Sequence, residues 1–385
     1  MGIKDTIAVR GMPSKMNSAV FDETPVRFDA ASTYALRQAG AVLLGKTHVP
    51  EFAMGKAPPT RNPFDARRTA GGSSSGCGAA VGAAMVPITL GNQTGGSLIR
   101  PSSFNANYGF KPTYGALNVA GMHPIAPSQD HIGPMAASLA DAWATAWEIS
   151  SRIGGHNGHP GLSGAPAVPR ALKPLRLARL ETLGMAQLDD ATREAMAQMC
   201  HRIAGQGVGI LDRECDDKIA ILEDLLLEAD DVSEQIFVYE LRWPLVAYLD
   251  ANGPDSVSAT AKARLDRGLA MTPADYRQAL VKRDRIRAQV ASVGQQVDGF
   301  ITLASSGPAP FDGVETGGST ADRPNSHLST GSRSFLSPWS MVGGPAFSLP
   351  LLSVDRMPVG LQVMGLVDTD YRLTAVARWL DEACG

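Results

Sequence analysis

Hydrophobic residues in the first part of the chain fall into short runs with two different spacings. Residues 29–41 and 137–154 have apolar positions at helical spacing, whereas 42–47 and 86–91 are short apolar runs typical of strands. Residues 76–85 consist almost entirely of small side chains, so a helix there must pack very close to its neighbours. This alternation of strands and helices predicts an α/β layered fold.

The middle of the chain is more helical and more charged. Residues 174–184 and 207–214 are expected strands. A long helix is expected over 272–297, because Thr272 suits the N-cap and Asp275 stands at the capping-box position.

The last part of the chain returns to strand character. A stretch rich in glycine, serine and proline covers 305–334, strands are expected at 344–352 and 357–365, and a helix at 370–383. We find no internal repeat. We therefore expect a single domain over residues 1–385.

Composition and charge narrow the class of protein. Hydrophobic residues make up 44% and charged residues 19% of the chain, which is a globular composition. The net charge of −3 gives no basic patch, so we expect no nucleic-acid partner. No apolar run approaches the ~20 residues of a membrane span, and no signal peptide is recognisable, so we expect a cytoplasmic protein without a membrane partner.

Cysteine and histidine spacings give no indication of a disulfide framework or a metal site. The four cysteines show no CxxC pair, which fits a reducing compartment. They are Cys77, Cys200, Cys215 and Cys384. No cysteine or acidic cluster accompanies His156 and His159, so we interpret that pair as a polar loop and expect no metal.

Two clusters of glycine and serine carry the candidate chemistry. One is GGSSSGCGAA from Gly71, and the other is GNQTGGS, which ends at Ser97. Amide groups of a glycine turn can converge on an anion, and a serine at the end of such a turn can be a nucleophile beside its own oxyanion hole. An ordinary glycine/serine loop is the alternative for this stretch alone.

Two single-cluster interpretations lack the strand that each requires. The run from Gly72 to Gly76 matches a nucleophile elbow, which would make Ser74 the nucleophile. The run from Gly76 to Gly82 approximates a dinucleotide-binding turn. The preceding residues 62–70 are polar and contain a proline, so neither pattern has its strand.

A third interpretation combines both clusters with a lysine. A neutral lysine can take the proton of a serine, and a second serine hydroxyl can relay it. Burial can lower the lysine pKa from ~10.4 by the roughly 3 units that this requires. The residues alone do not select the base among the nearby lysines, which are Lys4, Lys15, Lys46, Lys56 and Lys111.

Five motifs in this order resemble the amidase signature family. They are GIKDTIAVRGMP, AGAVLLGKTHVPEFAMG, GGSSSGCGAAVGAAMVPITLGNQTGGSLIRPSSF, GFKPTYGAL and DHIGPMA. The resemblance covers residues 2–150 and resumes at 344–365. It implies a large mixed β-sheet flanked by helices on both faces. The signature core would be 1–154 and 300–385, and 155–299 a variable, mostly helical region for substrate specificity.

The resemblance also implies the catalytic residues. Ser97 would be the nucleophile, Ser73 the relay on a cis Gly72–Ser73 peptide, and Lys4 the base. Ser97 would attack a carboxylic amide and form an acyl-enzyme, which water then hydrolyses, without cofactor or metal.

The remaining implied roles are supporting ones. The backbone N–H groups of the turn would form the oxyanion hole; they belong to Thr94, Gly95, Gly96 and Ser97. Ser74 would hydrogen-bond within the network, and Lys46 would lie on a structural strand.

The chain departs from the family pattern around the nucleophile. Family members commonly have Asp four residues before the serine and Arg two after it, where this chain has Gln93 and Ile99. We expect a pocket of its own kind. Arg100 would either anchor a substrate carboxylate or pair inside the fold. Ser340 stands where Asn is usual, and its effect is left open.

The start of the chain is a second departure. The family has several dozen helical residues before the strand that carries the lysine, whereas three residues precede Lys4 here. A strand so close to a chain end is expected to fray, and a frayed strand would bury the lysine poorly. A misassigned start, a compensating contact or weakened activity are the three alternatives.

Several functional alternatives stay open. The chain could be a glutaminase like the A subunit of the tRNA-dependent amidotransferase, or an amidase-fold binding protein without catalysis, and an esterase acting through Ser74 ranks last. The expected partner is a small-molecule amide, and a homodimer is possible. Tyr239, Trp243 and Trp339 could line an acyl pocket, although core positions are the more usual role for such residues.

Overall fold

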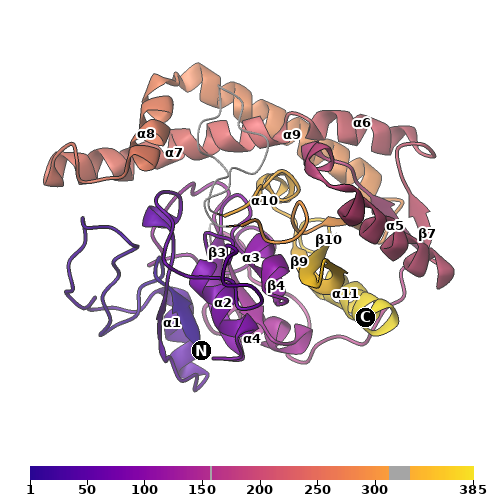
Figure 1. Ribbon diagram of the computed structural model, residues 1–385, viewed down its shortest axis with the longest axis horizontal. Coiled ribbons are helices and arrows are strands. Elements are labelled where there is room, and N and C mark those ends of the chain that lie inside the picture. The colour runs from indigo at the N-terminus through magenta and orange to yellow at the C-terminus, as the bar shows by residue number, and fades with distance from the viewer. Residues whose placement is uncertain (157, 312–329) are drawn as a thin grey trace.

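The computed structural model of this protein describes residues 1–156, 158–311 and 330–385 (Figure 1). Within them, ten strands form one mixed sheet in the order β2-β1-β3-β5-β4-β9-β10-β8-β6-β7. The strands are β1 (Gly2–Lys4), β2 (Gly45–Thr47), β3 (Ile88–Gln93), β4 (Tyr108–Lys111), β5 (His131–Ala136), β6 (Arg176–Arg179), β7 (Gly209–Leu211), β8 (Gly299–Leu303), β9 (Ala346–Val354) and β10 (Met357–Met364). The pairs at each end of the sheet are parallel, and those in its centre, from β3 to β8, are antiparallel.

Helices account for most of the remaining described residues. They are α1 (Ala31–Gln38), α2 (Ser75–Gly82), α3 (Ile99–Phe104), α4 (Leu139–Ile153), α5 (Asp190–Gly205), α6 (Asp217–Leu226), α7 (Ala229–Asn252), α8 (Ala259–Ala270), α9 (Pro273–Gly294), α10 (Ser337–Val342) and α11 (Asp370–Cys384). Among the described residues, no helix is long and apolar enough to cross a membrane.

The central strand β4 shows that helices cover both faces of the sheet. A Cβ atom added to Gly109 would lie 2.7 Å from the Cβ of Ser102 on α3. The next residue, Phe110, stacks on Phe347 with ring centroids 4.3 Å apart and lies 6.2 Å from Trp143 of α4. Because successive strand residues point to opposite faces, α3 and α4 pack on opposite sides. The predicted α/β/α architecture is confirmed.

The small residues of α2 allow two helices to pack very closely. A Cβ atom on Gly78 would lie 2.7 Å from the Asn105 side chain and 3.0 Å from the Pro101 carbonyl, so only glycine fits there. Asn105 donates hydrogen bonds to the carbonyls of Ala70 and Pro101 and thereby ties the start of α2 to α3. The two glycine/serine clusters therefore lie next to each other in space.

The N-terminal strand β1 lies inside the sheet, although the sequence predicts that a strand so close to a chain end frays. β1 pairs in parallel with β2 on one side and with β3 on the other. Ile3 and Lys4 are both fully buried, and the Leu44 amide donates to the Met1 carbonyl at 2.9 Å. Pairing on two sides compensates for the closeness of the chain end.

Most of the expected elements are found near their predicted bounds. Thr272 is the N-cap of helix α9 and forms the predicted capping box with Asp275. The strand expected over 42–47 is limited to Gly45–Thr47, because Val42 and Leu44 are exposed. The glycine-rich stretch expected over 305–334 falls partly on 312–329, which lie outside the described residues.

The helical middle of the chain forms a layer of its own beside the sheet. Helix α7 packs on both α8 and α9, and Figure 1 shows the three helices together along the upper edge of the molecule. Phe237 on α7 and Arg264 on α8 reach the cavity that contains both serine clusters. This layer therefore closes the cavity from the side opposite the sheet.

Candidate active site

The side chains expected as base and relay are in direct contact. Lys4 ends β1, and Ser73 lies in the turn just before α2. The Lys4 Nζ atom is 2.8 Å from the Ser73 Oγ atom and donates to the Asn92 carbonyl of β3 at 3.2 Å. The Gly72–Ser73 peptide is cis, as the resemblance implied. The sheet therefore holds Lys4 against the first serine cluster.

The surroundings of Lys4 favour its neutral form. Burial lowers the pKa of Lys4 to about 7, against the smaller opposing effects of Cys77 and Asp130, which raise it. An ordinary lysine has a pKa of ~10.4 and is almost entirely protonated at neutral pH. A lysine with a pKa near 7 has a substantial neutral fraction there, so Lys4 can accept a proton.

The nucleophile candidate Ser97 lies in the turn that connects β3 to α3. The turn residues Thr94, Gly95 and Gly96 are buried, whereas Ser97 is partly exposed and lines the same cavity as Ser73. A Cβ atom on Gly96 would lie 2.7 Å from Leu336, so the close approach of α10 requires glycine at this position. The sequence-predicted serines thus share one cavity.

Gln93, where the family resemblance implies an acid, joins the end of β3 to the start of α3. Its Oε1 atom accepts hydrogen bonds from the amides of Leu98 at 2.8 Å and Ile99 at 3.0 Å. Its Nε2 atom donates to the Ser340 Oγ atom at 2.8 Å. A neutral amide therefore caps α3, and this cap needs no charged partner. Ser340 supplies the acceptor for this amide.

Asp130 is a functional candidate that the sequence analysis did not single out. The Thr94 hydroxyl donates to its Oδ1 atom at 2.6 Å, and the amides of Ile125 and Ala126 donate to its Oδ2 atom at 2.9 and 3.2 Å. Burial raises the pKa of Asp130 to about 6, although these hydrogen bonds oppose the rise. Asp130 opens the DHIGPMA motif, so the signal was present. It fixes the first residue of the serine turn.

Ser74 is a buried structural residue in this arrangement. Its Oγ atom donates to the Asn92 carbonyl at 3.2 Å, and its side chain is fully buried. A nucleophile elbow requires a strand directly before the serine. Among the described residues between β2 and Ser74, the only β-type pairing is in the isolated β-bridges of Arg61 and Arg68, so that strand is lacking. Ser74 and Lys4 thus donate to the same carbonyl, that of Asn92.

Contacts distinguish Lys4 from the other lysines. Burial also lowers the pKa of Lys111 to about 7, but its Nζ atom donates to the carbonyls of Gly344 and Pro112, away from both serine clusters. Lys46 forms an ion pair with Asp5 at 2.9 Å. Burial alone therefore does not identify the base.

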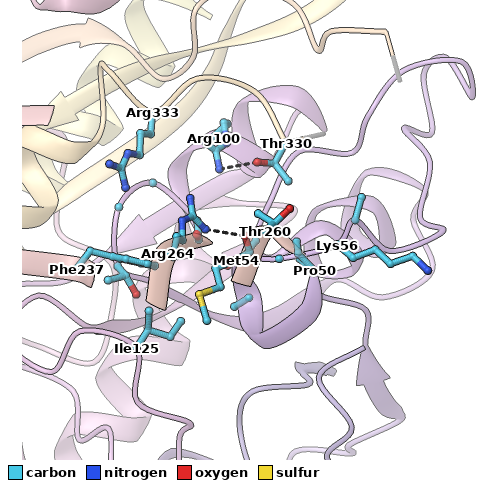
Figure 2. Close-up of a pocket in the computed structure, with 18 residues that line it drawn as sticks. Pro50, Met54, Lys56, Arg100, Ile125, Phe237, Thr260, Arg264, Thr330 and Arg333 are labelled. Carbon is cyan, nitrogen blue, oxygen red and sulfur yellow. Dashed lines mark hydrogen bonds between the residues drawn. The ribbon is translucent and has the colours of Figure 1, made fainter. Parts of the chain in front are cut away.

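A cavity of about 280 Å³ joins these groups (Figure 2). Its described lining comes from the two serine clusters, from residues 50–57, from Arg100 on α3, from Ile125, from α7 and α8, and from the segment before α10. The lining residues are Pro50, Ala53, Met54, Gly55, Lys56, Ala57, Ser73, Thr94, Gly95, Gly96, Ser97, Arg100, Ile125, Phe237, Thr260, Arg264, Thr330 and Arg333. This volume suits a small molecule.

Arg100 pairs inside the fold and also lines the cavity. Its guanidinium donates to the Gly331 carbonyl at 2.8 Å, the Gly72 carbonyl at 2.6 Å and the Thr330 hydroxyl at 3.3 Å. Figure 2 shows the last of these bonds at the edge of the cavity. Arg100 therefore connects the peptide that carries Ser73 to the segment before α10.

The three aromatic residues considered for an acyl pocket lie elsewhere. Trp339 is buried against Phe300 and belongs to the core. Trp243 is 63% exposed, so it is neither a core nor a pocket residue. Tyr239 stacks on Tyr276 with ring centroids 4.1 Å apart, outside the lining. The aromatic residue that lines the cavity is Phe237, two positions before Tyr239.

Comparisons with known proteins agree with this geometry. The family model described as Amidase matches residues 1–374. The A subunit of glutamyl-tRNA(Gln) amidotransferase from Salinispora tropica is 30% identical over 429 residues, which covers 100% of this chain and 83% of the relative. A crystal structure of an amidase has a TM-score of 0.84 at 27% identity and covers 100% of this chain and 84% of the other.

Another solved structure, the A subunit of glutamyl-tRNA(Gln) amidotransferase from Thermotoga maritima, has a TM-score of 0.76 at 26% identity. The alignment covers 99% of this chain and 82% of that one. The fold, the family match and the relatives lead to the same assignment. The chain therefore belongs to the Amidase family, the amidase signature enzymes, which hydrolyse carbon–nitrogen bonds.

Proposed function

We propose that this chain hydrolyses a small carboxylic amide to a carboxylate and ammonia or an amine, through an acyl-enzyme on Ser97. The observation that carries the proposal is the 2.8 Å contact between Lys4 Nζ and Ser73 Oγ, in a cavity that Ser97 also lines. A lysine with a pKa of about 7 is a base matched to neutral pH.

Acylation begins with proton transfer from Ser97 to Lys4 through the Ser73 hydroxyl. The Ser97 oxygen forms a bond to the amide carbon, and the carbonyl π electrons move to the oxygen. The tetrahedral oxyanion is stabilised by amides of residues 94–97, because those of Leu98 and Ile99 are already bonded to Gln93. The carbon–nitrogen bond then breaks, and the protonated Lys4 returns the proton through Ser73 to the leaving nitrogen.

Deacylation repeats the same steps with water as the nucleophile. Water gives a proton to Lys4 through Ser73 and attacks the ester carbon of the acyl-enzyme. When the second tetrahedral intermediate collapses, the Ser97 oxygen leaves and receives the proton back. The products are a carboxylic acid and the regenerated serine. No step requires a redox change or an additional reactant.

Two finer expectations belong to the same proposal. Helices α7 and α8, which belong to the variable region 155–299, supply Phe237, Thr260 and Arg264 to the cavity. We therefore assign this region the role of selecting the acyl group. We expect the enzyme to act in the cytoplasm on a free small molecule.

A second candidate function is a glutaminase like the A subunit of the glutamyl-tRNA(Gln) amidotransferase. The observation that favours it is the identity of 30% over the full chain to one such protein. Glutamine carries an ammonium group beside its carboxylate, and a site for it needs an acidic side chain. The described cavity lining contains no Asp or Glu, which favours the amidase.

The test is acyl transfer from a panel of small primary amides to hydroxylamine, with ammonia release measured in parallel. Hydroxamate forms when an acyl-enzyme is intercepted. We expect Ser97→Ala, Ser73→Ala and Lys4→Met each to reduce both products by on the order of 10³-fold or more. Ser74→Ala is the matched control, since this serine is in the same run but does not line the cavity, and it should retain activity within about tenfold.

The opposite patterns would overturn the proposal. Loss of activity in Ser74→Ala with retention in Ser97→Ala would indicate a nucleophile elbow. Hydrolysis of glutamine alone, stimulated by the other proteins of an amidotransferase, would favour the glutaminase. Tight amide binding to the wild-type chain without turnover of any amide would favour a non-catalytic binding protein.

A further inference from the structure

One guanidinium group is held over the serine turn with a nitrogen facing the turn. Arg333 forms ion pairs from Nε to Asp230 at 3.2 Å and from Nη2 to Glu234 at 2.6 Å, and its side chain is 13% exposed. Its third nitrogen, Nη1, has no hydrogen-bond partner within the described part of the chain, and it lies 3.4 Å from the position of a Cβ atom on Gly95. Two carboxylates on α7 thus fix Arg333 with one donor nitrogen at the cavity.

The described lining of the cavity contains more cations than the described carboxylates near them neutralise. Arg100, Arg264 and Arg333 all line it. The ion-pair partners among these groups are Asp230 and Glu234, and Glu234 also pairs with Arg267 outside the cavity. Figure 2 shows the three guanidinium groups gathered on one side of the cavity, whereas Lys56 points away from them. The described lining therefore carries an excess of positive charge.

The arginines destabilise one another as long as no anion is bound. Burial and, after it, the neighbouring Arg333 together lower the pKa of Arg100 to about 9. Burial also lowers the pKa of Arg264. Burial would lower the pKa of Arg333 as well, but the negative charges of Glu234 and Asp230 outweigh this effect, so the pKa of Arg333 is raised. An anion in the cavity would relieve the repulsion, and Arg333 would remain charged to bind it.

We infer that the substrate of this enzyme is an anionic amide, the monoamide of a short dicarboxylic acid, whose free carboxylate binds Arg333 and Arg264. The inference rests on the proposed function of Ser97 and adds the substrate class to it. The carboxylate accepts from Arg333 Nη1 and from the Arg264 guanidinium, while the amide carbonyl lies over the turn at Ser97. Arg100 contributes charge but directs its hydrogen bonds to two backbone carbonyls and to the Thr330 hydroxyl.

Ion pairing of this kind recognises an anion rather than a neutral or zwitterionic amide. A guanidinium fixed by two carboxylates loses little side-chain entropy when it binds a third, because its orientation is already set. The absence of Asp and Glu from the described lining leaves no partner for a substrate ammonium group. Glutamine should therefore be a poor substrate although it carries a carboxylate.

The first test compares matched substrates with the wild-type enzyme. The monoamides of the three-, four- and five-carbon dicarboxylic acids are compared with neutral primary amides of equal chain length and with glutamine. We expect kcat/KM for the best anionic amide to exceed that for its neutral partner by on the order of 100-fold. We also expect this ratio to fall with added salt. Equal kcat/KM values for the two classes would overturn the inference.

Variants locate the carboxylate. Arg333→Gln should raise KM and lower kcat/KM for the anionic amide by on the order of 100-fold, and change kcat/KM for the neutral amide less than about threefold. Arg264→Gln should also raise KM and lower kcat/KM for the anionic amide. This variant is used instead if Arg333→Gln does not fold. Arg267→Gln is the matched control, since Arg267 pairs with the same Glu234 at 2.9 Å but does not line the cavity. Equal losses for both substrate classes would assign Arg333 to the reaction rather than to recognition.

A binding measurement separates failure of the inference from failure of the proposed function. Ser97→Ala removes the nucleophile and leaves all three arginines in place. Calorimetry should show that succinamate binds this variant at least tenfold more tightly than butyramide does. If no amide is hydrolysed but succinamate binds with this preference, the proposed function fails and the anion site stands. If amides are hydrolysed but succinamate and butyramide bind equally, only the inference fails.

Discussion

At the residue scale, two buried lysines show how contacts assign chemistry that burial alone leaves undecided. Lys4 and Lys111 are both fully buried, and desolvation lowers the pKa of each to about 7. Only Lys4 contacts a serine of the cavity, at 2.8 Å from Ser73. Lys111 bonds to backbone carbonyls at the end of β4. A proton relay requires both the shifted pKa and the contact.

The lowered pKa of Lys4 predicts how reactivity depends on pH. Protonated Lys4 cannot accept the Ser97 proton, so the rate of Ser97 phosphonylation by a fluorophosphonate should fall about tenfold per pH unit below the pKa and reach a plateau above it. The midpoint should lie at pH about 7. The measurement is the rate of labelling against pH, followed by intact mass.

Two variants control this pH profile. Lys4→Met should lower the plateau rate by on the order of 10³-fold, since the base is removed. Lys111→Met removes the other lysine of equal burial and should keep the wild-type midpoint, whatever it does to stability. If the midpoint moves in Lys111→Met but stays the same in Lys4→Met, the proton is transferred to Lys111 and not to Lys4.

At the element scale, the polar side chain that ends β3 determines how α3 begins. Gln93 accepts from two backbone amides and donates to Ser340 on α10, and so joins a strand to two helices. Ser340 in turn donates to the Leu336 carbonyl at 3.1 Å. The serine turn lies between Gln93 and the amides that it caps. The cap therefore holds the position of Ser97 as well as the start of the helix.

Removal of this cap should cost stability in proportion to the bonds lost. Gln93→Ala leaves the amides of Leu98 and Ile99 buried without an acceptor, so we expect the free energy of unfolding to fall by about 3 kcal/mol. Ser340→Ala removes only the acceptor of the Gln93 amide and should cost about 1 kcal/mol. Urea denaturation of the two variants and the wild type measures both values. Equal stability of Gln93→Ala and the wild type would show that the cap does not hold α3.

Sequence patterns predicted those elements whose signals are local. The capping box of α9, the small residues of α2 and the strands β9 and β10 are all determined by neighbouring residues. The strand expected over 42–47 was too long, because Val42 and Leu44 are apolar but exposed. An apolar run indicates a strand, yet it does not show where pairing ends.

At the scale of the whole molecule, the cavity unites segments that are distant in the sequence. Ser73 and Ser97 come from the signature region. Arg264 comes from α8, and Arg333 comes from the segment that follows residues 312–329. The family resemblance implied the serines and Lys4 because they stand in motifs. It could not indicate Arg333, whose role depends on Asp230 and on the turn that it faces. Such a role exists only after folding.

The position of β1 gives a prediction for the folded molecule. Since β1 pairs on both sides and Ile3 is fully buried, its amides should open only when the sheet unfolds. Hydrogen exchange should therefore show residues 2–4 protected to the level of β3 and much more than the exposed stretch 22–25. Rapid exchange of residues 2–4 would show that the strand frays and that Lys4 is intermittently exposed.

The central claim is that Lys4 activates Ser97 for nucleophilic attack, and covalent labelling tests it most directly. The wild-type chain, Ser97→Ala and Lys4→Met are treated with a fluorophosphonate beside a known serine hydrolase, and intact mass and peptide mapping follow. The account predicts one adduct on Ser97 in the wild type, none in Ser97→Ala and on the order of 10³-fold slower labelling of Lys4→Met. An adduct on Ser74, or equal labelling rates for Lys4→Met and the wild type, would contradict it.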